Sequence, residues 1–104
     1  MTSPRRGEVW LVDLGLVAKV RPCLVLSVPP GAKDRALVTL LAHTTSPRGS
    51  QFEVAVKARF LKQGAFDAQS LVTVPHVKLL RKLGELSSDQ MSLVETALRR
   101  WLGF

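Results

Sequence analysis

The chain has 104 residues, which is enough for one hydrophobic core and too few for two. Hydrophobic residues make up 46% of the sequence and charged residues 22%, which excludes a disordered chain, and the apolar runs are too short to cross a membrane. Fifteen Lys and Arg against eight Asp and Glu give a net charge of +7, which favours an anionic partner such as nucleic acid or an acidic protein segment.

Three strands are predicted in the first half of the chain. Residues 7–14 (GEVWLVDL) are rich in β-formers, and a short connection, 15–19, leads to the second strand, 21–28 (RPCLVLSV). Pro22 lacks an N–H donor and therefore belongs at the start or the edge of a strand. Residues 35–42 (RALVTLLA) are apolar on both faces, so we expect this third strand to be central.

The second half begins with a polar loop, 44–51, followed by an alternating strand, 52–57. Residues 59–67 are expected to be irregular because Gly64 interrupts them, and 70–74 form a fifth strand that ends at Pro75.

One helix is predicted, at the C-terminus. Ser87 is a good N-cap, Gln90 completes a capping box, and Gly103 is placed to end the helix. An apolar stripe runs along it: Met91, Val94, Leu98, Trp101 and Leu102. Short strands with one terminal helix predict a mainly β (α+β) fold, a small antiparallel barrel with the helix packed on it.

Several classes of chemistry are absent from the sequence. Two histidines, one cysteine and no close carboxylate cluster do not give the spacing of a metal site, and no phosphate-binding or dinucleotide fingerprint is present. We therefore expect no metal and no cofactor. The single Cys23 is expected to be a core thiol, and no apolar segment follows the basic N-terminus, so we expect a cytoplasmic protein without a signal peptide.

Polar groups at strand ends remain as candidates. Arg21 is either a solvated strand terminus or a fixed positive charge aimed at an anionic substrate. Thr44, Thr45 and Ser46 follow the third strand with Arg48 in the same loop, and their hydroxyls either cap the loop backbone or contact a ligand. His43 is either a buried, hydrogen-bonded residue, which we favour, or a proton-transfer group.

Two motifs resemble a known family. Residues 7–14 followed by 21–27 (RPCLVLS) are similar to the opening of MazF/PemK-type toxins. The later order is similar too: a third strand ending in threonine, a Phe-Glu-Val strand, and 83–87 (LGELS) leading into a terminal amphipathic helix. The resemblance covers residues 6–104 and so nearly the whole chain, which we expect to be a single MazF/PemK-like domain, 1–104.

The resemblance implies a homodimeric, SH3-like barrel that cleaves single-stranded RNA without a metal. Such enzymes leave a cyclic phosphate and a free 5′ hydroxyl and are neutralised by an antitoxin with an acidic tail. The family's catalytic arginine falls on Arg21 and its threonine on Thr44, with Thr45 as the competing assignment. The connection at 15–19 is shorter than is usual in the family, where this loop helps to cover the RNA groove.

Other residues are candidates for RNA contacts. Lys19, Arg48 and Lys78 would attract phosphate, and Thr45, Ser46 and His76 complete the predicted RNA-binding set. The proton acceptor stays open: the resemblance assigns acid–base duty to Arg21, and His43 or His76 is the alternative. Two other functions also stay open, namely a non-catalytic barrel that binds nucleic acid or protein, and a toxin that poisons DNA gyrase.

Overall fold

A computed structural model of the chain describes residues 3–17 and 19–104. Met1 and Thr2 at the expected leaderless N-terminus, and Ala18 in the predicted connection, lie outside the described residues. The elements, in chain order, are β1 (Glu8–Asp13), β2 (Val20–Val25), β3 (Leu37–Thr44), β4 (Glu53–Ala55), β5 (Ala65–Pro75), the 3-10 turn η1 (His76–Lys78), β6 (Leu79–Glu85) and α1 (Ser88–Leu102).

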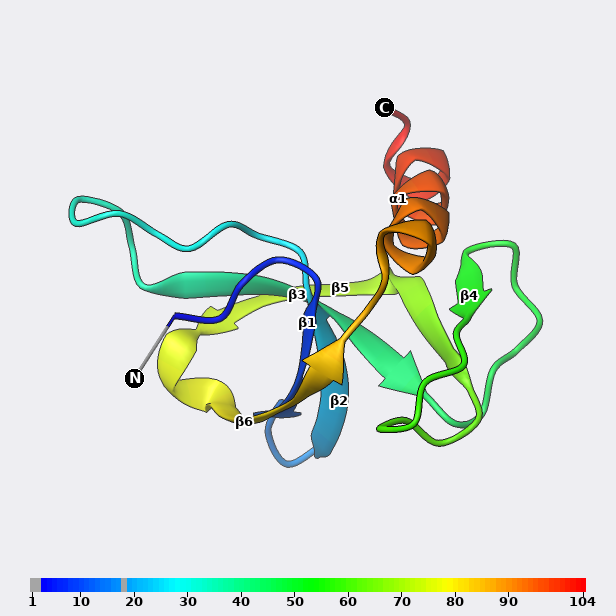
Figure 1. Ribbon diagram of the computed structural model, residues 1–104, viewed down its shortest axis with the longest axis horizontal. Helices are drawn as coiled ribbons and strands as arrows, with labels where there is room; N and C mark the ends of the chain where they lie inside the picture. Colours follow the sequence, from blue (N-terminus) through cyan, green and yellow to red (C-terminus); the bar gives the residue numbers. More distant parts are fainter. Residues whose placement is uncertain (1–2, 18) are drawn as a thin grey trace.

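The strands form one six-stranded sheet in the order β4-β5-β3-β2-β1-β6, and every neighbouring pair is antiparallel. The sheet bends strongly, so that β6 and the start of β5 curl away from the central strands (Figure 1). Register shifts between β1 and β6 and between β3 and β5 mark the bends. The predicted small antiparallel barrel with a C-terminal helix is confirmed, although no ladder joins β4 to β6 among the described residues.

Two hydrophobic clusters lie on opposite faces of the central strands, because successive side chains of a strand point to opposite sides. One cluster joins β1, β2 and β3 to Val74 and Leu79 at the far end of β5 and the start of β6. In the other cluster, Val9, Leu24 and Leu41 pack with Phe66, Val56 and the α1 residue Val94. The third strand is therefore central and buried on both faces, as its composition predicts.

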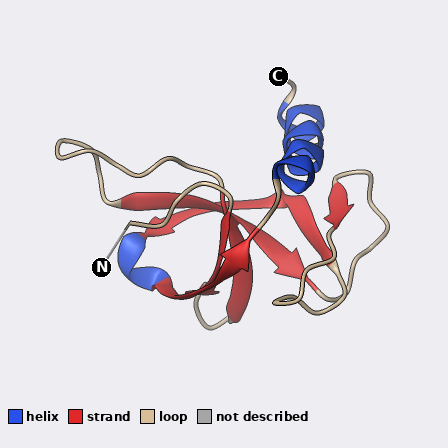
Figure 2. Cartoon of the chain, viewed as in Figure 1, coloured by secondary structure: helices blue, strands red, loops and turns tan. Residues whose placement is uncertain are grey.

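The C-terminal helix confirms its predicted ends. The Ser87 hydroxyl accepts the backbone N–H of Gln90 at 3.1 Å, and the Oε1 atom of the Gln90 side chain accepts the Ser87 N–H at 2.9 Å. Gly103 adopts φ of 80°, which only glycine reaches without strain. The predicted stripe packs only in part: Val94 is buried, whereas Trp101 is 44% exposed, because α1 extends past the sheet (Figure 2).

The largest difference from the sequence-based prediction lies between residues 59 and 85. β5 begins at Ala65 and runs for 11 residues. The segment expected to be irregular, 59–67, is therefore irregular only as far as Gly64, and a strand follows that glycine. β6 was not predicted, because its pattern (LLRKLGE) follows no clean alternation and its ladder to β1 is interrupted twice. The predicted fourth strand, 52–57, shrinks to three residues at the sheet edge.

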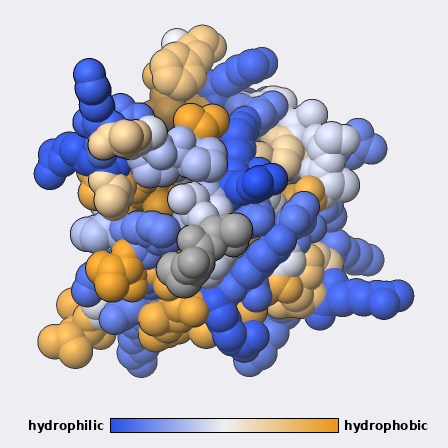
Figure 3. Space-filling view, turned by 60° about the vertical axis from the view of Figure 1, so that its left-hand side comes forward, coloured by the Kyte–Doolittle hydropathy of each residue, from blue (hydrophilic) through white to orange (hydrophobic). Residues whose placement is uncertain are grey.

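The surface is mixed. On the face drawn in Figure 3, hydrophobic side chains form several separate patches between hydrophilic ones. The described helices include none with the length and apolarity that a membrane crossing requires.

Candidate active site

The register of β2 and β3 brings Arg21 and Thr44 together. In the antiparallel β2–β3 pair, Cys23 lies opposite Ala42. If this register continues for two more residues, toward the start of β2 and the end of β3, Arg21 lies opposite Thr44. Residues that face each other across an antiparallel pair lie within side-chain reach. Arg21, near the start of β2, and Thr44, at the end of β3, therefore lie at the same end of this strand pair.

Both side chains line a pocket of about 520 Å³, which we call the basic pocket. Among the described residues, no carboxylate lines it, and its cationic side chains come from three segments far apart in the sequence. Its lining residues are Leu11, Val20, Arg21, Pro22, His43, Thr44, Thr45, Ser46, Phe60, Lys62, Arg81 and Leu83. The predicted pair Arg21 and Thr44 is thus brought together with Thr45 and Ser46.

Lys62 and Arg81 also line the basic pocket, where the sequence pattern does not predict them. Arg81 pairs with Leu11 across the β1–β6 ladder, and Leu11 in turn pairs with Pro22, so the three residues share one face. Lys62 enters from the segment between β4 and β5. Arg81 would have been a candidate if β6 had been predicted to pair with β1, but the sequence pattern does not predict this strand.

A glycine immediately before β5 packs against the backbone of Thr44. A Cβ atom at Gly64 would lie 2.0 Å from the Thr44 carbonyl oxygen and 2.8 Å from Cε1 of His43. Only glycine lets β5 begin this close to the end of β3. The Thr44 hydroxyl accepts the backbone N–H of Ser46 at 3.1 Å, so its position is also set by its own turn.

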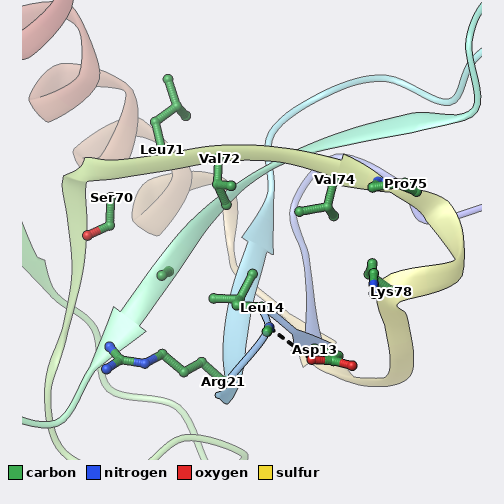
Figure 4. Close-up of a pocket in the computed structure, with 11 residues that line it drawn as sticks. Asp13, Leu14, Arg21, Ser70, Leu71, Val72, Val74, Pro75 and Lys78 are labelled. Carbon is green, nitrogen blue, oxygen red and sulfur yellow. Dashed lines mark hydrogen bonds between the residues drawn. The ribbon is translucent and has the colours of Figure 1, made fainter. Parts of the chain in front are cut away.

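A second pocket of about 500 Å³, which we call the apolar pocket, meets the basic pocket at Arg21 (Figure 4). It is lined by Asp13, Leu14, Gly15, Arg21, Ala42, Ser70, Leu71, Val72, Val74, Pro75 and Lys78. Lys78 and Asp13 also border a shallower hollow that includes Lys19. Two of the predicted RNA contacts, Lys19 and Lys78, therefore lie on the Asp13 side of Arg21 and not in the basic pocket.

The remaining predicted contacts lie outside both pockets. The Arg48 side chain is exposed in the loop after β3, and its backbone N–H donates to Glu53 Oε2 at 2.9 Å. His76 lies in η1, and its Nε2 atom is enclosed without a hydrogen-bond partner among the described residues.

His43 is a core residue. It is 3% exposed, and its ring packs edge-on against Phe66 with the ring centroids 5.1 Å apart. Burial lowers the pKa of His43, because the charged imidazolium would lose its hydration. Its Nε2 atom is enclosed and has no hydrogen-bond partner among the described residues, so a substrate in the pocket does not reach this nitrogen.

Several acidic side chains accept backbone N–H groups in loops and turns. Asp13 accepts the N–H of Gly15, Asp34 that of Gly31, and Asp67 that of Gln69, at 2.8–2.9 Å. Glu53 accepts the N–H groups of Arg48 and Ser50, and the Arg48 hydrogen bond is the main reason that its pKa is lowered. These carboxylates therefore hold loop backbone in place.

Cys23 is buried beside Arg21, and burial raises the pKa of its thiol to about 12. It is a core residue, as expected. Within residues 3–17 and 19–104, no three His, Cys, Asp or Glu side chains gather in the manner of a metal site.

Known proteins resemble the chain along its full length. It is 32% identical over 103 residues to a Mycobacterium tuberculosis protein named endoribonuclease MazF4, covering 99% of this chain and 96% of that one. A solved mycobacterial endoribonuclease in complex with its cognate antitoxin superposes with a TM-score of 0.84 at 29% identity, covering 98% of this chain and 97% of that one. MazF in a MazE–MazF structure from Deinococcus radiodurans shares the fold with a TM-score of 0.83 at 23% identity, covering 100% and 99% of the two chains.

The profile of the PemK-like, MazF-like toxins of type II toxin–antitoxin systems matches residues 5–102, which include every strand, the helix and both pockets. The chain therefore belongs to the PemK-like, MazF-like toxin family.

Proposed function

We propose that this chain is a toxin that cleaves single-stranded RNA at Arg21 and Thr44 without a metal ion. The observation that carries the proposal is the basic pocket itself, in which Arg21 and Thr44 lie with Lys62 and Arg81 and without any carboxylate. Such a pocket attracts a polyanion. The relatives named as endoribonucleases match 99% of the chain, which supports the same activity here.

The chemistry follows from the charge that the reaction creates. The ribose 2′ oxygen attacks the adjacent phosphorus, a new P–O bond forms, and the bond to the 5′ oxygen of the next nucleotide breaks. Negative charge grows on the non-bridging oxygens, where the Arg21 guanidinium donates two parallel hydrogen bonds. One well-placed donor of this kind stabilises a transition state by about 3–4 kcal/mol. The products are a 2′,3′-cyclic phosphate and a 5′ hydroxyl.

Thr44 donates its hydroxyl to the same phosphate while its oxygen accepts the Ser46 N–H. The family resemblance assigns proton transfer to Arg21. The enclosed Nε2 atoms of His43 and His76 favour that assignment over either histidine.

The RNA strand passes along the cationic residues on both sides of Arg21. Lys62 and Arg81 hold neighbouring phosphates in the basic pocket, and Lys19 and Lys78 do so on the Asp13 side. Thr45 and Ser46 offer hydroxyls beside Thr44. Arg48 and His76 complete the proposed RNA-binding set from positions outside the two pockets.

The partner of such a toxin is an antitoxin whose acidic tail occupies the same basic pocket. A solved relative is described as bound to its cognate antitoxin, which supports this pairing. We also propose that 1–104 acts as one domain, that it works in the cytoplasm, and that two copies pair. The half-exposed Trp101 and Leu102 at the end of α1 are consistent with such pairing.

Cleavage in EDTA tests the proposed function. Purified protein is expected to cut a mixed-sequence RNA in EDTA and to leave a fully 2′-O-methylated copy intact. Arg21→Ala is expected to abolish cutting, whereas Arg35→Ala, which removes an exposed arginine between β2 and β3, retains it.

Three outcomes contradict the proposal. Full activity of Arg21→Ala overturns the assigned site. Binding without cleavage, weakening steeply with salt, identifies a non-catalytic nucleic-acid-binding barrel. A complex with DNA gyrase while RNA stays intact identifies the gyrase-poisoning alternative.

A further inference from the structure

The apolar pocket adjoins the proposed cleavage site at a single shared residue. Arg21 lines both pockets, and Figure 4 shows its side chain extending from β2 along the lower edge of the apolar pocket. A phosphate held by Arg21 therefore sits at the mouth of this second cavity. Because each phosphate is joined to a base through one ribose, a neighbouring base lies within reach of the cavity.

The walls of the apolar pocket suit a flat ring. Leu14, Val72 and Val74 point into the space between β2 and β5, whereas Leu71 points away from it (Figure 4). A cavity of about 500 Å³ lies within the range that encloses small organic ligands. Single-stranded RNA can splay an unstacked base into such a pocket, where the Watson–Crick edge is read by hydrogen bonds.

The polar groups of the pocket differ from those around the phosphate. Asp13 supplies the only carboxylate among the lining residues, and Lys78 adds an ammonium group. The Asp13 Oδ1 atom accepts the Gly15 N–H at 2.9 Å, which fixes the side chain at the edge of the cavity. An ionised carboxylate accepts about four hydrogen bonds, so it has capacity for a ligand beyond this one.

We propose that the apolar pocket binds the base next to the cleaved phosphate and that Asp13 makes guanine the preferred base. This inference rests on the proposed function. Guanine presents two adjacent donors, N1–H and N2–H, which together match a carboxylate, and its O6 acceptor suits the Lys78 ammonium. In adenine and cytosine the position next to the amino group is a ring nitrogen with a lone pair, and the carboxylate repels this lone pair. Uracil offers only one N–H donor, so it makes one hydrogen bond where guanine makes two.

The experiment is cleavage of an RNA library with randomised positions, followed by sequencing of the 5′ ends of the products. Wild-type protein is expected to enrich guanine at one position beside the cleaved bond. Asp13→Asn is expected to lower the preference for guanine over the other bases by about tenfold to hundredfold, because the amide offers one acceptor and one donor in place of two acceptors. The Asn oxygen still accepts the Gly15 N–H, so the turn is retained.

Asp34→Asn is the matched control. This substitution removes the same charge as Asp13→Asn. Like Asp13, Asp34 accepts a backbone N–H in a turn, from Gly31 at 2.8 Å, but Asp34 lies between β2 and β3 and lines neither pocket. Its cleavage profile is expected to equal that of the wild type. An Asp13→Asn profile equal to that of the wild type, or a wild-type profile without guanine enrichment, overturns the inference.

A binding measurement separates this inference from the proposed function. Four 2′-O-methyl hexanucleotides that alternate uridine with one of the four bases cannot be cleaved, so their affinity is measurable whether or not the protein is a nuclease. Tightest binding of the guanine-containing hexamer, lost in Asp13→Asn and kept in Asp34→Asn, supports the base pocket even if no RNA is cut. Equal affinity for all four hexamers overturns it even if RNA is cut.

Discussion

Two regions of this molecule use the same residue types in opposite ways. In the basic pocket, Arg21, Lys62 and Arg81 converge without a carboxylate. At the start of β1 and the end of β6, which we call the charge-paired junction, Lys82 forms ion pairs with Glu8 at 3.1 Å and Glu85 at 2.7 Å.

The charge-paired junction also ties the N-terminus to the barrel. Glu8 accepts the Arg5 backbone N–H at 2.8 Å and the Trp10 indole N–H at 3.0 Å, and Arg6 pairs with Glu95 on α1. β6 belongs to both regions, because Arg81 faces the basic pocket while its neighbour Lys82 faces the junction. The cations of the junction serve the fold, and we propose that those of the basic pocket serve a ligand.

The largest effect is expected from Gly64→Ala, which acts on the end of β3 that carries Thr44. The new Cβ would lie 2.0 Å from the Thr44 carbonyl oxygen, so the backbone of β3 or β5 must move. We expect a loss of about 1–3 kcal/mol in the free energy of unfolding and a loss of RNA cleavage beyond what that destabilisation explains. Urea unfolding and initial cleavage rates measure the two effects.

Gly31→Ala is the control for this change, since its Cβ would lie 3.3 Å from the Asp34 carboxylate, a side chain able to move. Wild-type stability and cleavage in Gly64→Ala would show that the close approach to Thr44 is not required.

Substitutions at the neighbouring residues Arg81 and Lys82 test whether the basic pocket and the charge-paired junction have different roles. Arg81→Gln is expected to weaken RNA binding by about tenfold and to change the melting temperature little. The slope of log K against log salt concentration is expected to fall by about one, the value for one lost phosphate contact. Lys82→Gln removes the same charge one residue away but breaks the Glu8 and Glu85 ion pairs. We expect it to lower the melting temperature slightly and to leave RNA binding nearly unchanged, as titration of labelled RNA at several salt concentrations would show.

If the two variants weaken RNA binding equally, net charge and not the basic pocket governs binding. The contrast between the two regions would then not hold.

The smallest effect concerns the charge-paired junction and its pH dependence. Burial acts to raise the pKa of Glu8, but hydrogen bonds from the Arg5 N–H, Trp10 and Lys82 outweigh it and leave the pKa lowered. A carboxyl whose folded pKa lies below its unfolded value stabilises the fold above the unfolded pKa, and this stabilisation is lost as pH falls through the folded pKa.

Glu8→Gln is therefore expected to cost about 1 kcal/mol at neutral pH and progressively less below pH about 4.5. Thermal unfolding of both proteins from neutral pH to pH 3 measures the difference. A constant difference over this range would contradict the assigned role of the Glu8 carboxylate.

The sequence predicted the architecture because its strongest signals are local. The capping box at Ser87 and Gln90, Gly103 after the helix, and the doubly apolar third strand all specify structure within a few residues. Arg21 and Thr44 are predicted from their places at strand ends and from the family resemblance, and both line the basic pocket.

Contacts between distant parts of the chain bring Lys62 and Arg81 into the basic pocket and place Arg21 between the two pockets. β6 carries no clean alternation, and its register with β1 shifts twice, so no local pattern indicates that Arg81 faces Leu11. Gly64 was read as a breaker, because the sequence alone does not show the Thr44 carbonyl that requires it. Residues whose role comes from a distant strand are the ones that sequence reasoning missed.

In the proposed reaction, a phosphate held at Arg21 is attacked by the 2′ oxygen of the adjacent ribose. The most direct test is mass spectrometry of both new ends of a single RNA cut by the purified protein in EDTA. We predict a 2′,3′-cyclic phosphate on one fragment and a 5′ hydroxyl on the other. A 5′ phosphate paired with a 3′ hydroxyl would show that water attacks the phosphorus, and it would contradict the mechanism.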